Sequence, residues 1–140
     1  MLILSLIGLI AAAFAIYTFI LWFNQYTRHH AQYEFFTKEH SVAMVFSYAL
    51  MFFGNSWMQT ALLNHGDSMN GAILLTAGVL LFAGVILNNF LKAPKRYALI
   101  GSIAQIILYI PIAMGVMIIV AALTVAASGA KPVYNLNSRD

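Results

Sequence analysis

The sequence predicts an all-α integral membrane protein that folds as one bundle of four transmembrane helices. Three observations lead to this prediction: 62% of the 140 residues are apolar, only 8% are charged, and four long apolar runs contain no Asp, Glu, Lys or Arg. A soluble domain has about 25% charged residues, which keep its surface hydrated. A hydrocarbon core of roughly 30 Å needs about 20 apolar residues in helix. The four runs are 2–23, 41–63, 71–90 and 97–127.

The first run, 2–23, is expected to remain in the protein as a membrane helix. A cleaved signal peptide begins with basic residues and has a shorter apolar core. No basic residue precedes this run, and its end is aromatic, which is typical of the membrane interface where Trp and Tyr gather. The run also lacks the alternation of polar and apolar residues that marks a barrel strand. It is therefore predicted as a helix.

The second run, 41–63, is joined to the third, 71–90, by the short polar segment NHGDSMN. Asn, Gly, Asp and Ser favour turns and helix caps. Asp67 or Ser68 is expected to cap the third helix. The two helices should therefore form an antiparallel pair.

The fourth run, 97–127, is longer than a membrane span requires. Its 31 residues would extend about 46 Å as a helix. Pro111 lies near its middle, where a proline removes one backbone hydrogen bond and bends a helix. Tilt, a bend or a protruding end would absorb the excess length. A short polar tail, 128–140, follows this run.

The orientation in the membrane follows from the positions of Lys and Arg, because cytoplasmic loops carry an excess of them. The loops at 24–40 and 91–96 hold five of these residues, the loop between the second and third runs holds none, and the tail holds Lys131 and Arg139. We therefore expect the loops 24–40 and 91–96 in the cytoplasm and both termini outside. The cytoplasmic (inner) membrane of a bacterium is the expected location.

Several polar side chains lie inside the apolar runs. Asn55 and Gln59 are four residues apart, so they share one helix face. An amide without a partner in hydrocarbon is costly, which favours hydrogen bonds between helices. The alternative is a polar pore or pocket lined by the same side chains. The candidates for either role are Tyr48, Asn55, Gln59, Ser102, Gln105 and Tyr109.

Small residues recur at helical spacing in two of the runs. Lipid supplies no hydrophobic force between helices, so close backbone approach at small residues provides the van der Waals contact. Such seams fit packing within the chain and contact between copies of the chain equally well. The predicted seams consist of Gly8, Ala12 and Ala15 in the first run and Gly71, Gly78 and Gly84 in the third.

The chain has few reactive side chains, so we predict no cofactor, no metal site and no catalytic residue. The chain has no Cys, which excludes disulfides and thiolate chemistry. All titratable Asp, Glu and His side chains fall in loops, at helix ends or in the tail, outside the positions that proton-coupled transport requires. The alternative metal ligand set comes from the first loop, 24–40, and consists of His29, His30, Glu34 and His40.

These observations favour a non-catalytic accessory or assembly subunit. We expect it to associate with the lipid bilayer and with itself or other membrane subunits, and not with nucleic acid. The first alternative is a channel or facilitator for a small solute, lined by Asn55, Gln59, Ser102 and Gln105. The second alternative is an enzyme at the membrane surface that uses the loop 24–40.

Overall fold

The computed structural model describes residues 2–129, and over that range its regular elements are all helices. The four helices are α1 (Leu2–Ala31), α2 (Lys38–Leu63), α3 (Met69–Lys92) and α4 (Lys95–Gly129). The predicted all-α class is thereby confirmed. By length and composition, α1, α3 and α4 could each cross a membrane. The described residues therefore show three candidate spans where the sequence predicts four, since the polar side chains of α2 dilute its apolar character.

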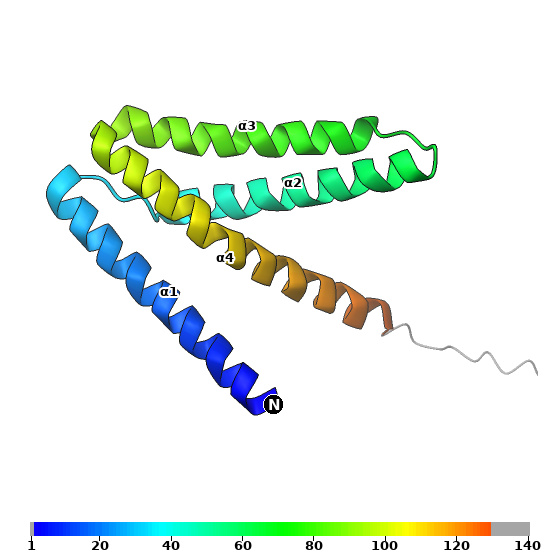
Figure 1. Ribbon diagram of the computed structural model, residues 1–140, viewed down its shortest axis with the longest axis horizontal. Coiled ribbons are helices and arrows are strands. Elements are labelled where there is room, and N and C mark those ends of the chain that lie inside the picture. The colour runs from blue at the N-terminus through cyan, green and yellow to red at the C-terminus, as the bar shows by residue number, and fades with distance from the viewer. Residues whose placement is uncertain (1, 130–140) are drawn as a thin grey trace, which may run out of the picture.

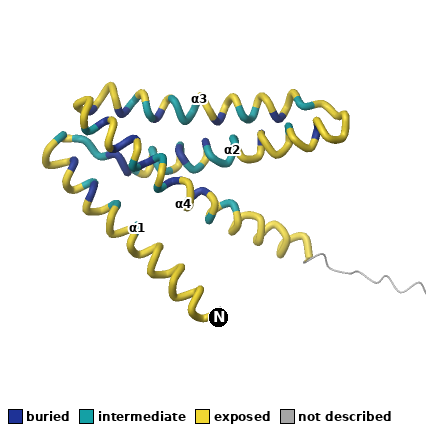
Figure 2. Tube along the Cα trace, viewed as in Figure 1, coloured by how far each residue is buried: buried dark blue, intermediate teal, exposed yellow. Residues whose placement is uncertain are grey.

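The helices are arranged as a fan that is closed at one end and open at the other (Figure 1). The α1–α2 and α3–α4 connections lie at the closed end. α2 and α3 run side by side in opposite directions, whereas α1 and the second half of α4 diverge from them. Figure 2 shows that most buried residues lie near the closed end, while the outer part of α1 is exposed.

The contact between α2 and α3 depends on glycines at three positions. A Cβ atom at Gly71 would lie 2.6 Å from the backbone nitrogen of Met58, and one at Gly78 would lie 2.9 Å from the carbonyl oxygen of Ser47. Facing Gly71, a Cβ atom at Gly54 would lie 2.8 Å from the Gly71 carbonyl oxygen. A side chain at any of these positions would hold the two backbones apart. The antiparallel pair predicted from the turn is present.

The α1–α2 connection forms part of the core. α1 continues two turns beyond the predicted end of its apolar run, and the connection is only the segment 32–37. The Phe35 side chain is fully buried and lies against Gly101 of α4. The Asn24 side chain holds the connection from α1, because it donates to the Phe36 carbonyl oxygen at 2.8 Å and accepts from the Phe36 amide at 3.0 Å.

Helix ends agree with ordinary capping chemistry. The Thr37 hydroxyl accepts a hydrogen bond of 3.2 Å from the His40 amide and so caps α2. Asp67 Oδ1 accepts from the Met69 amide at 2.8 Å at the start of α3. α4 continues through Pro111.

Candidate functional site

A cluster of hydrogen-bonded polar side chains lies at the closed end of the fan. It joins the α1–α2 connection to α2, α3 and α4. We call it the polar cluster, and it consists of Tyr33, His40, Asn88, Asn89, Ser102 and Gln105.

Asn89 is the centre of the polar cluster. Its side chain is fully buried in α3, and its Nδ2 donates to Ser102 Oγ at 3.0 Å and to Gln105 Oε1 at 2.6 Å, both on α4. Its Oδ1 accepts from the Tyr33 hydroxyl at 3.2 Å. Gln105 Nε2 in turn donates to the Phe35 carbonyl oxygen. One asparagine thus couples three segments of the chain.

His40 occupies the other side of the polar cluster. Its Nδ1 lies 2.9 Å from the Phe35 carbonyl oxygen, which can only accept, so Nδ1 carries the proton. Its Nε2 then accepts from Asn88 Nδ2 at 3.0 Å. Asn88 Nδ2 also donates to the Tyr33 hydroxyl at 3.2 Å. Burial raises the pKa of the Tyr33 phenol, which keeps this hydroxyl protonated and able to donate.

Further polar contacts join the helices beyond the polar cluster. The hydroxyls of Ser41 and Tyr109 are 2.6 Å apart, and the Tyr48 hydroxyl donates to the Ile106 carbonyl oxygen at 3.0 Å. Ser47 Oγ donates to the Gly78 carbonyl oxygen at 2.7 Å. Among the described residues, every buried side-chain nitrogen and oxygen has a hydrogen-bond partner. These groups therefore bind one another and present no unpaired buried atom to a ligand.

The six polar residues singled out from the sequence divide into two sets. Ser102, Gln105 and Tyr109 are buried, and Tyr48 is half-buried with its hydroxyl bonded to α4. Asn55 and Gln59 are exposed on α2.

The four residues of the predicted pore are not brought together. Gln105 reaches back to Phe35, which precedes α2, whereas Asn55 lies 17 residues beyond the start of that helix. Those residues span about 25 Å along α2. Asn55 instead borders an open groove of about 300 Å³ between α2 and α4. The amides on α2 and α4 therefore lie at different levels of the fan.

The residues of the predicted seams also fall into two sets, one in contact with another helix and one without such contact. Gly71 and Gly78 are buried against α2, but a Cβ atom at Gly8 or Gly84 would have no neighbour within 4 Å. In α1, Ala12 and Ala15 are exposed. Ala12 lines an apolar groove of about 480 Å³ between α1 and α4. The seam of α1 thus has no close partner among the described residues.

Sequence reasoning missed Tyr33, Asn88 and Asn89. The adjacent amides of Asn88 and Asn89 were a usable signal, because two asparagines inside an apolar run both need partners. Their partners come from distant segments, with Tyr33 lying 56 residues from Asn89. Periodicity along one helix does not reveal such partners.

The histidines do not gather into a ligand set. His30 Nδ1 lies 2.9 Å from the Tyr26 carbonyl oxygen on its own helix, and His40 belongs to the polar cluster. Arg28 and Glu34 form an ion pair. Within residues 2–129, no three His, Cys, Asp or Glu side chains lie close enough together to hold a metal ion.

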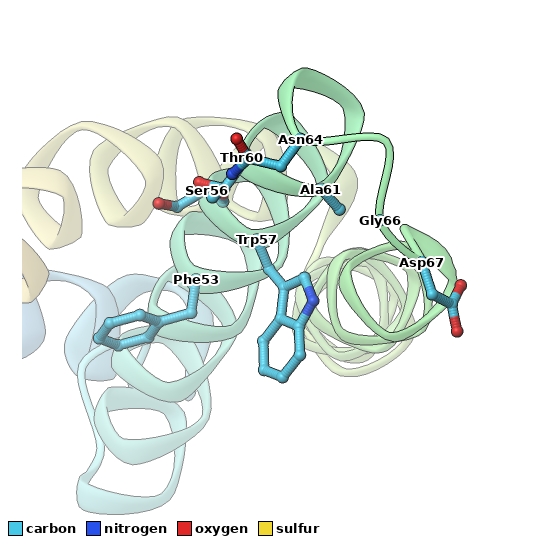
Figure 3. A pocket seen from close by; sticks show the side chains of 8 residues that line it. All are labelled: Phe53, Ser56, Trp57, Thr60, Ala61, Asn64, Gly66 and Asp67. Atoms are coloured by element: carbon cyan, nitrogen blue, oxygen red, sulfur yellow. The ribbon is translucent and has the colours of Figure 1, made fainter.

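An open pocket of about 490 Å³ lies at the α2–α3 turn (Figure 3). Its polar side chains are divided: Ser56, Thr60 and Asn64 lie on a different side of α2 from Trp57, and the Asp67 carboxylate points away from them. Thr60 Oγ1 bonds the Ser56 carbonyl oxygen at 2.9 Å, and Asp67 caps α3. These two side chains therefore make local hydrogen bonds near the end of α2 and the start of α3.

Comparison with known proteins does not add to this picture. No family model, no curated protein and no solved structure matches the chain. The function is therefore argued from the polar cluster and from the exposed surfaces of the helices.

Proposed function

We propose that the protein is a non-catalytic accessory or assembly subunit of the bacterial inner membrane, and that all four helices cross the bilayer. In this proposal the closed end of the fan is a rigid frame. α1 and the outer half of α4 are the surfaces that meet other membrane helices, either of a second copy or of another subunit.

The packing of α2 on α3 supports four crossings. Contacts run along the pair from Ser47 opposite Gly78 to Met58 opposite Gly71. α3 has the length and composition of a span. A helix that lies antiparallel to α3 over this length shares its depth in the bilayer. The polar residues of α2 are accommodated because Ser47 and Tyr48 bond to neighbouring helices.

The position of α1 is the observation that carries the assembly proposal. None of its residues from Ile3 to Trp22 is buried, although it is long and apolar enough to cross a membrane. Lipid alone would solvate such a helix. However, the lining of the groove between α1 and α4 includes the small residues Ala12, Ala13 and Gly115 among larger apolar side chains, and small residues allow another helix to approach closely.

The closed polar cluster supports the non-catalytic part of the proposal. General acid–base catalysis needs a titratable group that can reach a substrate. His40 has both ring nitrogens engaged, and the Tyr33 hydroxyl bonds two asparagines. We propose cytoplasmic loops at 24–40 and 91–96, with both termini outside, because the Lys and Arg residues concentrate in these loops.

Photo-crosslinking from within native membranes tests the assembly proposal. A benzoylphenylalanine at Ala12, inside the α1–α4 groove, should give one discrete adduct of defined mass. The same group at Leu80, 67% exposed on α3, is the matched control and should give none. Adducts of the two variants that are equally weak and heterogeneous would contradict the proposal.

Reconstitution separates the channel alternative from the assembly proposal. Under the assembly proposal, purified protein in liposomes shows no solute flux above that of empty liposomes. Flux that is abolished by Asn55→Leu together with Gln59→Leu would favour the channel.

A further inference from the structure

The α3–α4 connection carries an exposed group of basic side chains. Lys92 ends α3, Lys95 and Arg96 begin α4, and all three are exposed. Within residues 2–129 the one recorded ion pair joins Arg28 to Glu34, so no carboxylate neutralises these three charges. We call them the basic rim.

The backbone beneath the basic rim is held in place. The Ala93 amide donates to the Asn89 carbonyl oxygen and the Ala98 amide to the Pro94 carbonyl oxygen, both at 2.9 Å. Ala93 and Ala98 are themselves buried. Asn89 is the centre of the polar cluster, so the connection is joined to the hydrogen-bonded part of the fold. The three exposed residues thus lie within five positions of one another on a backbone that is held at both sides.

Exposed apolar side chains flank the basic rim along α3 and α4. Leu91 is 84% exposed in the last turn of α3, and Leu99 and Ile100 are more than half exposed in α4. Charge and apolar surface therefore follow each other within one helical turn. A ligand with an anionic group and a hydrocarbon chain could contact both the basic residues and the adjacent apolar residues.

Within residues 2–129, the Lys and Arg residues gather at one end of the fan. All of them lie at the closed end, where the α1–α2 and α3–α4 connections meet (Figure 1): Arg28, Lys38, Lys92, Lys95 and Arg96. Glu34 and Glu39 lie at the same end, and Glu34 pairs with Arg28. The α2–α3 turn at the other end has Asp67 as its carboxylate and no Lys or Arg. Among the described residues, the positive charge that can attract an anionic ligand is therefore at the closed end.

We propose that the basic rim binds the headgroup of an anionic phospholipid, whose acyl chains lie against Leu91, Leu99 and Ile100. Basic residues beside a membrane span attract anionic lipid through their combined charge. The adjacent apolar surface favours a phospholipid over free phosphate or nucleic acid, which offer no hydrocarbon to cover it. The proposal does not depend on a protein partner and holds whether the protein is a subunit, a channel or an enzyme.

Quenching of tryptophan fluorescence by brominated lipids tests this site. The native tryptophans are removed as Trp22→Phe and Trp57→Phe, and a single reporter is introduced as Leu91→Trp beside the basic rim. The matched control is Leu63→Trp, because Leu63 is 80% exposed in the last turn of α2, beside a turn that has no Lys or Arg. Vesicles of phosphatidylcholine contain either brominated phosphatidylglycerol or brominated phosphatidylcholine.

The reporter at position 91 should show a relative binding constant for phosphatidylglycerol over phosphatidylcholine on the order of five-fold or more. The reporter at position 63 should show a ratio near one. Replacing Lys92, Lys95 and Arg96 by Gln should bring the first ratio close to one, and Lys92→Arg with Lys95→Arg should preserve it. High salt should also lower it, because screening weakens the attraction.

Equal ratios at the two reporters would overturn the proposal, as would a preference that survives neutralisation of the basic rim. If the triple variant does not fold, as judged by circular dichroism, the single variants Lys92→Gln and Lys95→Gln decide the matter. Each should lower the ratio, and an unchanged ratio in both would equally overturn the proposal.

Discussion

At the scale of single residues, chemically identical side chains differ in burial and in hydrogen bonding. Asn89 is fully buried and makes three side-chain hydrogen bonds, whereas Asn55 is exposed on α2. In low dielectric a hydrogen bond is strong, and a polar atom without a partner is correspondingly costly. Asn89 therefore fixes the relative positions of α3, α4 and the α1–α2 connection. Asn55 is exposed and does not have this role.

Replacing Asn89 by Leu should destabilise the fold by about 1–3 kcal/mol, because Ser102, Gln105 and Tyr33 each lose a partner while remaining buried or half-buried. The matched control, Asn55→Leu, removes an exposed amide and should change stability by less than about 0.5 kcal/mol. Reversible unfolding in mixed micelles measures both. Similar losses in the two variants would contradict the role assigned to Asn89.

Ionisation of the Tyr33 phenol should weaken the polar cluster at alkaline pH. Burial raises the pKa of its phenol above the ordinary value of about 10. Its stabilising contribution is therefore fully present below pH 10 and is lost as the pH rises through the folded-state pKa. Tyr33→Phe should therefore reduce, by one phenol, the tyrosinate absorbance that appears at higher pH than in a free peptide. An unchanged titration curve in the variant would show that another tyrosine is responsible.

At the scale of elements, α2 and α3 form the tightest unit of the fan, and glycine makes it possible. A Cβ atom at Gly78 would lie 2.7 Å from Met51 Cγ and 2.9 Å from the Ser47 carbonyl oxygen. Ser47 Oγ also donates to the Gly78 carbonyl oxygen, so packing and hydrogen bonding coincide at this position. α1 is different, because its buried residues, Phe23 and Thr27, are confined to its last turns.

Gly78→Leu should therefore separate α2 from α3 and destabilise the protein by about 1–3 kcal/mol, the usual cost of overpacking. Gly84→Leu in the same helix is the control, because a Cβ atom there has no neighbour within 4 Å. Its effect on the unfolding free energy should be near zero. A lowered helix content or midpoint in both variants would show that the loss reflects helix insertion and not contact with α2.

At the scale of the whole molecule, the fan has one closed, positively charged end and one open end (Figure 1). The closed end contains the polar cluster, the core aromatic residues and the α1–α2 and α3–α4 connections. Figure 2 shows that exposure increases along α1 and α4 away from it. Most buried side chains are thus concentrated at the closed end, and the outer parts of α1 and α4 are exposed.

Single-cysteine labelling tests the proposed topology and is simplified because the chain has no native Cys. Glu39→Cys and Asn64→Cys replace exposed residues at the two ends of α2. If α2 crosses the bilayer, a membrane-impermeant maleimide added to intact cells should label position 64 and spare position 39, and both should react after lysis. Labelling of both positions from the same side would show that α2 does not cross.

Much of the fold is predictable from the sequence because helices in lipid satisfy their own backbone. The apolar runs locate the four helices, and the polar turn before Met69 predicts the α2–α3 pair. The sequence does not predict that α1 continues to Ala31, because residues 24–31 are mostly polar, which is typical of a loop. Their helical conformation is stabilised by packing, with Phe23 and Thr27 buried at the closed end.

The candidate site is predictable only in part. Ser102 and Gln105 stand out because amides and hydroxyls in hydrocarbon need partners, and Gly71 and Gly78 because small residues allow close approach. Tyr33 does not stand out and His40 stands out only as a possible metal ligand, because both fall in a segment that resembles an ordinary polar loop. Their partner Asn88 is 48 residues from His40 along the chain.

The sequence by itself determined the helical class, the membrane character and the concentration of charge in two loops, because these follow from composition and from local helix periodicity. Only the tertiary structure decided which amides are paired, that Asn55 and Gln105 lie at different levels, and that α1 stands apart from α2 and α3. The physical reason is that periodicity places residues on a common helix face. Which faces meet depends on contacts between distant segments, such as Phe35 against Gly101 and Asn89 against Gln105.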